Sequence, residues 1–256
     1  MSHQPWDQID PRMACIPSGL CEPSSSRTAG TSMKGYFVTG TDTNAGKTYV
    51  TCAMARRGLV HGHKVFAFKP IETGCASGAN GELVGADQEL ISTAAGDWQQ
   101  GALRGLYRFP LPAAPLVAAE AANATIDLAQ VVGTVHRGAE ENHATLTLVE
   151  GAGGWRVPIT READMSALAR ELALPVLIVA RACLGTINHT LLTIEAVQHD
   201  GLTLAGVVLS QRAEDDPSSA QSNRSEILRR WPGLVLILST EPLVLDCLVP
   251  VSPRST

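Results

Sequence analysis

Short apolar runs alternate with stretches of helical periodicity along most of this sequence, and that alternation restricts the fold more than any other feature. The runs are GYFVTG, KVFAFKP, TLTLVEG, PVLIVA, LAGVVLS and GLVLIL, and each has the length of one buried strand. Helical spacing predicts helices over 46–61, 127–141, 164–173, 187–199 and 217–230. Strands that alternate with helices form a parallel sheet covered on both faces. We therefore expect a doubly wound, mostly parallel α/β fold.

Composition agrees with a globular α/β protein and argues against other classes. Of the 256 residues, 45% are hydrophobic and 18% are charged, which permits a large core. The net charge of −5 argues against a surface that binds nucleic acid through its phosphates. No apolar run has the length of a membrane span, so no membrane partner is expected. The six cysteines lack metal-binding spacing, which favours reduced thiols in a cytoplasmic protein.

Residues 1–32 differ in character from the rest of the chain. They are rich in Pro, Ser and Gly and show no clear period, so we expect a disordered leader. A secretory signal is not indicated, because the long apolar stretch of such signals is missing. Met33 stands just before the first apolar run and is a candidate start. The remainder, 33–256, is expected to form a single domain.

The stretch GTDTNAGKT, residues 40–48, lies between the first predicted strand and the first predicted helix. Gly46 lets the backbone approach a phosphate, and the N–H groups of residues 44–48 can point into the same hollow. Lys47 supplies a positive charge for the phosphates, and Thr48 offers a hydroxyl to Mg²⁺. The stretch therefore predicts a phosphate-binding loop with GKT at its end.

This loop is one residue longer than usual. Phosphate loops commonly have four residues between the first glycine and the Gly-Lys pair, whereas five separate Gly40 from Gly46 here. The added length changes how Asp42 and Thr43 project. We expect these two residues to reach beyond the nucleotide, to a second substrate.

Polar residues also follow the other strands, at the sheet edge where ligands of such folds bind. Lys69, after the second run, is a candidate for stabilising negative charge, although a solvated strand end is the alternative. Asp87 is either a functional carboxylate or the cap of the helix that follows it. Glu150 ends the third run beside small residues at 151–154, as an Mg²⁺-binding carboxylate does. A helix that begins near Thr186 has free N–H groups for an anion.

These motifs together resemble those of the dethiobiotin synthetase family. YFVTGTDTNAGKT, KPIETG, VEGAGGW and LGTINHTLLT…GLTLAGV occur in that family's order and spacing, over roughly residues 34–210, and the longer phosphate loop is typical of it. The resemblance implies an ATP- and Mg²⁺-dependent ligase of biotin biosynthesis. Its substrates would be 7,8-diaminononanoate and CO₂. A carbamate forms on the diamine, ATP phosphorylates it, and the second amine closes a cyclic urea.

The resemblance also implies roles for individual residues. The catalytic residues would be Lys69, which steadies the carbamate and the mixed anhydride, Lys47, which binds phosphate oxygens, and Thr43. The expected Mg²⁺ ligands are Thr48, Asp87 and Glu150. The expected nucleotide-binding residues are Asn44, Ala45, Gly46, Lys47, Thr48, Tyr49, Asp87, Glu150, Gly151, Ala152, Gly153 and Ser210. The expected substrate-binding residues are Thr73, Gly151, Ala152, Gly185, Thr186, Ile187 and Asn188.

The family implied by these motifs is homodimeric. In it, the LGTIN segment of one subunit binds the substrate carboxylate in the site of the other subunit. This agrees with the anion-binding helix start expected near Thr186.

The chain departs from the family where the nucleotide base would bind. The strand LAGVVLS normally ends in Asn-Asp, which contacts adenine, but it ends here in Ser210-Gln211. The family often has Glu in place of Asn44. The segment after about residue 238 lacks the family's Gly-x-Ile-Pro turn. The loss of the Asn-Asp pair predicts weak discrimination among nucleotides.

Three alternatives were weighed against this resemblance. A cobyrinate amidating ligase shares the scaffold but carries a glutaminase domain, for which this chain is too short. A regulatory ATPase of the partitioning type usually has a second lysine early in the loop, where this chain has Thr41-Asp42-Thr43. A divergent, inactive relative that acts as a binding protein is the third.

Overall fold

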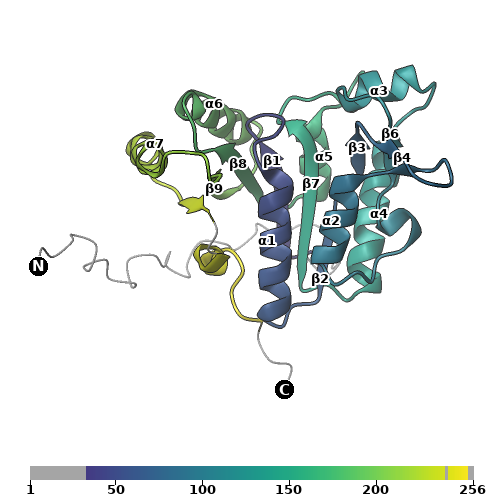
Figure 1. Cartoon of the computed structure of the whole chain (residues 1–256), viewed down its shortest axis with the longest axis horizontal. Helices are drawn as coiled ribbons and strands as arrows, with labels where there is room; N and C mark the ends of the chain where they lie inside the picture. Colours follow the sequence, from purple (N-terminus) through teal and green to yellow (C-terminus); the bar gives the residue numbers. More distant parts are fainter. Residues whose placement is uncertain (1–32, 240–241, 253–256) are drawn as a thin grey trace, which may run out of the picture. The chain divides into compact units, whose positions relative to one another are not determined.

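All six predicted strands form, and they belong to one sheet. The computed structural model describes residues 33–239 and 242–252, so the predicted leader lies outside the described residues. The strands pair in the order β10-β9-β8-β1-β7-β2, and every neighbouring pair is parallel. Their bounds are β1 Gly35–Gly40, β2 Val65–Phe68, β7 Leu146–Gly154, β8 Val176–Arg181, β9 Leu204–Ser210 and β10 Val235–Leu238 (Figure 1).

Helices cover both faces of this sheet, as predicted. One face carries α1 (Lys47–Val60), α2 (Ala86–Ala94) and the 3₁₀ helix η3 (Pro242–Cys247). The other carries α4 (Leu128–Glu141), α5 (Met165–Leu172), α6 (Thr186–His199) and α7 (Pro217–Arg230). The five helices predicted from periodicity begin and end within one residue of their predicted bounds.

The two covered faces explain why the strands are apolar throughout. Consecutive residues of a strand point to opposite faces of the sheet. In β1, Phe37 packs with the helices α4 to α7, whereas its neighbour Val38 packs with α1 and α2. Both side chains are fully buried, so neither position tolerates a polar residue.

Short elements between β2 and α4 were not predicted. They are β3 (Ile71–Thr73), which pairs with β6 (Tyr107–Phe109), β4 (Ala76–Ser77), which pairs with β5 (Leu83–Val84), the 3₁₀ helix η2 (Gly101–Leu103) and α3 (Pro115–Ala121). Each is too short for hydrophobic periodicity to reveal it.

The C-terminal segment packs along α1. Leu245 and Leu248 are buried in the core between α1 and the sheet. Arg57, in the last turn of α1, donates from Nη2 to Oδ2 of Asp246 at 2.7 Å. The C-terminal segment therefore runs towards the C-terminal end of α1, which is opposite to the end that carries the GKT sequence. Among the described helices, none combines the length and the apolar character that crossing a membrane requires.

Candidate active site

The predicted phosphate loop turns from β1 into α1 and depends on its glycine. Gly46 has a φ of 99°, in the left-handed region that favours glycine. A Cβ atom at this position would lie 2.4 Å from Oγ of Ser210. No described side chain caps α1, so the first N–H groups of the helix are available to an anion.

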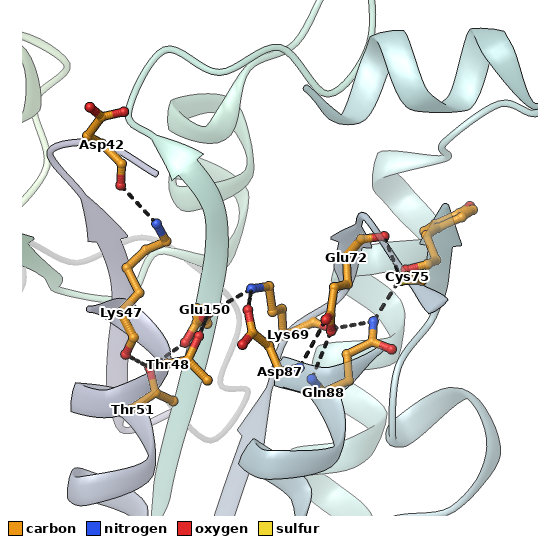
Figure 2. A network of polar contacts seen from close by, with 11 residues as sticks. Asp42, Lys47, Thr48, Thr51, Lys69, Glu72, Cys75, Asp87, Gln88 and Glu150 are labelled. Carbon is orange, nitrogen blue, oxygen red and sulfur yellow. Dashed lines mark hydrogen bonds and ion pairs between the residues drawn. The ribbon is translucent and has the colours of Figure 1, made fainter. Parts of the chain in front are cut away.

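The side chain of Lys47 folds back into this loop. Its Nζ donates to the carbonyl oxygen of Asp42 at 3.1 Å, and the residue is only 6% exposed (Figure 2). Burial lowers the pKa of Lys47, and the charge of Glu150 partly offsets that effect. An ammonium has three donors, so Lys47 retains capacity for phosphate oxygens.

Glu150 is fully buried and contacts both helix α1 and Lys69. Its Oε1 accepts from Oγ1 of Thr48 at 2.9 Å and lies 3.0 Å from Nζ of Lys69. Its Oε2 accepts from Oγ1 of Thr51 at 2.8 Å. Both carboxylate oxygens are therefore paired, as a fully buried charge requires.

Lys69 lies between two carboxylates, and Figure 2 shows its ammonium between Asp87 and Glu150. Burial alone would lower the pKa of Lys69, but the charges of Glu150 and Asp87 outweigh burial and raise the pKa above its ordinary value. The side chain therefore carries its positive charge at neutral pH. A fixed cation of this kind is suited to stabilising a developing anion.

Asp87 lies in the first turn of α2 and does not cap that helix. The cap residue is Gly85, and the carboxylate of Glu72 accepts from the backbone N–H groups of Asp87 and Gln88, each at 2.9 Å. Burial raises the pKa of Glu72, and these two hydrogen bonds oppose the shift. Glu72 thus caps α2, and the Asp87 carboxylate is directed to Lys69.

A cavity of about 550 Å³ connects the phosphate loop to these residues. Its volume is in the range of small-molecule sites. Many of the predicted site residues line it: Thr43, Asn44, Gly46, Lys47, Thr48, Tyr49, Lys69, Thr73, Asp87, Ala152 and Gly153. Residues from the loops after β1 and β2, from β3 and β7, and from the starts of α1 and α2 thus surround one space.

Other predicted residues do not line this cavity. Glu150 lies beneath it, bonded to Thr48, and Ser210 is buried against Gly46. The start of α6 also lies apart from the walls of the cavity. The predicted residues outside the walls are Ala45, Glu150, Gly151, Gly185, Thr186, Ile187, Asn188 and Ser210.

Three residues of this region were not predicted from the sequence. Arg212 lines the cavity and donates from Nη2 to the carbonyl oxygen of Asn44 at 3.3 Å. It follows β9, so attention to the residues after each strand would have found it. Thr51 and Glu72 carry no comparable signal, because a threonine in a helix and a carboxylate beside a strand are ordinary features.

Comparison with known proteins identifies the family. A family model described as an AAA domain matches residues 34–240. The ATP-dependent dethiobiotin synthetase BioD of Anaeromyxobacter dehalogenans (strain 2CP-C) is 42% identical over 77% of this chain and 85% of the relative. The chain belongs to the dethiobiotin synthetase family. A dethiobiotin synthetase of Pseudomonas aeruginosa (strain UCBPP-PA14) is 37% identical over 78% of this chain and 87% of its own length.

A solved structure supports the fold independently. The MinC:MinD cell division protein complex of Aquifex aeolicus aligns with a TM-score of 0.50 and 15% identity, over 86% of this chain and 87% of that chain. At this identity the likeness concerns the fold alone. The predicted phosphate-loop α/β fold and the resemblance to the dethiobiotin synthetase family are both confirmed, whereas the roles of individual residues stay predictions.

Proposed function

We propose that this protein closes the cyclic urea of dethiobiotin from 7,8-diaminononanoate and CO₂, at the expense of ATP, in biotin biosynthesis. Relatives that are 36% to 42% identical carry the name ATP-dependent dethiobiotin synthetase. The observation that carries the proposal is the cavity shared by the phosphate loop and Lys69. An inactive binding protein is not favoured, because Lys47, Lys69, Asp87 and Glu150 are all present, although Asn44 stands where the family often has Glu.

The two lysines have separate tasks in this proposal. Lys69 is fixed by Glu150 and Asp87, so its charge is already in place when the carbamate and the mixed anhydride form. Lys47 binds oxygens of the phosphoryl group that ATP transfers to the carbamate. Thr43 and Thr73, in the cavity wall, orient the diamine together with the backbone of residues 151–154, of which Ala152 and Gly153 line the cavity.

The residues present fit Mg²⁺. Thr48, Asp87 and Glu150 offer hard oxygen donors. Asp87 and Glu150 both contact the Lys69 ammonium, and the hydroxyl of Thr48 is bonded to Glu150 (Figure 2). When bound, the ion would neutralise charge on the phosphates of ATP.

A coupled assay tests the function directly. The full-length protein is mixed with diaminononanoate, bicarbonate, Mg²⁺ and ATP, and phosphate release is followed together with dethiobiotin by mass spectrometry. We expect phosphate release that requires the diamine and matches the amount of product. Phosphate release without dethiobiotin would instead indicate an ATPase of another kind.

We also propose that the protein acts as a homodimer in the cytoplasm, with one ligase domain from Met33 onward. The start of α6, Gly185 to Asn188, lies outside the cavity of its own chain, so a second copy is needed to bring these residues to the substrate. The neighbouring Leu184 is 98% exposed, which suits an interface. A two-fold interface would form two equivalent sites.

Leu184→Asp is expected to convert the dimer into monomers and to lower activity in parallel, because it places a charge in the proposed interface. Val60→Asp is the matched control, since Val60 is exposed at the far end of α1. Light scattering and the coupled assay are run on both variants across a dilution series. Full activity from a monomeric wild-type protein would contradict the shared site.

Discrimination among nucleotides is expected to be weak. Ser210 has a single short hydroxyl and is buried against Gly46, so it does not read the edge of a base. Bidentate base contacts in DNA recognition contribute about 1–3 kcal/mol, and about 1.4 kcal/mol is a factor of ten. We expect kcat/KM for ATP to exceed those for GTP and CTP by about tenfold or less. A preference of a hundredfold would show that another residue reads adenine.

A further inference from the structure

Given the proposed function, the order of the strands indicates on which side of β1 the transferred phosphate of ATP lies and on which side the nucleoside lies. Lys69 follows β2 on one side of β1, whereas Arg212 follows β9 on the other side. The phosphates must lie over residues 46–48, and the transferred one must face Lys69. The nucleoside therefore extends towards the ends of β9 and β10.

Tyr49 lies at this nucleoside end. It belongs to the first turn of α1, lines the cavity and is 48% exposed. Its hydroxyl donates to the carbonyl oxygen of Ser239, just beyond β10. This hydrogen bond holds the ring over the ends of the strands and leaves part of it exposed.

Arg212 lies at the same end. Its Nη2 donates to the carbonyl oxygen of Asn44 at 3.3 Å, and Nη1 lies 3.7 Å from Oε1 of Glu214. The side chain is 45% exposed and lines the cavity, so much of the guanidinium is accessible to a ligand. A guanidinium is planar and stacks on aromatic rings as well as pairing with anions.

Ser210 and Gln211 occupy the positions from which the edge of a base would be contacted, but both contact other parts of the protein. Ser210 is buried against Gly46. The amide nitrogen of Gln211 donates to the carbonyl oxygen of Asp215 at 3.5 Å. Among the residues that the structure describes, Tyr49 and Arg212 are planar groups that line the cavity at the nucleoside end.

We propose that Tyr49 and Arg212 bind the nucleobase through its faces. Every base presents a π-face, so such contacts tolerate both purines and pyrimidines. The cation of Arg212 adds attraction to the ring system of the base. Affinity for nucleoside triphosphates then depends on these two residues, whereas selectivity among the bases stays low.

The test compares nucleotides with a ligand that has no base. Dissociation constants for ATP, GTP, CTP and inorganic tripolyphosphate are measured calorimetrically with Mg²⁺ on the full chain. Tyr49→Ala and Arg212→Gln are each expected to raise the dissociation constants of all three nucleotides about tenfold and to leave that of tripolyphosphate unchanged. Tyr49→Phe keeps the ring but loses its hydrogen bond to Ser239, so it is expected to weaken nucleotide binding less than Tyr49→Ala does. Arg137→Gln is the control, because Arg137 is 53% exposed on α4, outside the cavity.

Each contrary result has a distinct meaning. An equal loss of tripolyphosphate binding would place Arg212 on the phosphates and overturn the proposal. A loss confined to ATP would indicate edge recognition, and unchanged affinities would remove both residues from the site. Lys47→Ala separates these outcomes from a failure of the proposed function. If that variant binds tripolyphosphate normally, the phosphate-loop assignment fails, whatever Tyr49 and Arg212 do.

Discussion

Lys47→Ala is expected to lower kcat by about 10²- to 10³-fold, the usual effect of removing a preorganised electrostatic contact from a transition state. The ammonium of Lys47 is buried beside the loop and has the Asp42 carbonyl as its protein acceptor. Its removal takes away the charge that would follow the phosphoryl group during transfer. The coupled assay at saturating ATP measures the loss, and circular dichroism checks the fold. Near-normal turnover by a folded variant would reject the phosphate loop.

The pH dependence of ATP binding gives a second measure of Lys47. Burial lowers the pKa of Lys47, so in the free protein this side chain loses its proton at a lower pH than an ordinary lysine does. ATP affinity of the wild type is therefore expected to fall as pH rises towards the ordinary lysine pKa of about 10.4. Lys47→Ala is expected to lack that decline. Identical pH profiles would show that another group is responsible.

Lys69→Met is expected to lower both turnover and stability. The variant removes the cation that would stabilise the carbamate, so we expect a fall in kcat of about 10² or more. It also leaves Glu150, which is fully buried, without its ammonium partner. Breaking a buried ion pair by removing one partner commonly costs about 3–5 kcal/mol. Urea unfolding of the protein without Mg²⁺ measures that loss.

The double variant Lys69→Met, Glu150→Gln separates the two effects. It removes the unpaired buried charge, so most of the stability lost in Lys69→Met is expected to return, while turnover is not. Mg²⁺ is expected to stabilise Lys69→Met more than the wild type, because the ion supplies a cation near Glu150. A Lys69→Met protein as stable as the wild type would show that the Lys69–Glu150 pair contributes little to the fold.

Much of the fold was predictable because its signals are local. Each main strand is a continuous apolar run, and each long helix repeats its apolar residues over several turns. The short elements between β2 and α4 have no such repeat. The capping of α2 by Glu72 joins positions 15 and 16 residues apart, which no local pattern encodes.

The candidate site was predictable to a similar extent. Lys47 lies in a recognisable loop and Lys69 follows β2. Glu150 was expected to end its strand, but β7 continues to Gly154, so Glu150 lies within it. The position of Arg212 after β9 is a usable sequence signal, whereas its contact with Asn44 joins residues 168 positions apart and has no local signal. The burial of Ser210 against Gly46 likewise depends on the packing of β9 beneath the loop, which only the structure reveals.

The packing of the C-terminal segment along α1 limits how far the protein can be shortened. Leu245 and Leu248 fill the core between α1 and the sheet, and Asp246 is tied to Arg57. Shortening the chain to the end of β10 would uncover this apolar strip, and the recombinant product would be prone to aggregation. Shortened versions of the protein should therefore keep the segment that carries Leu245 and Leu248.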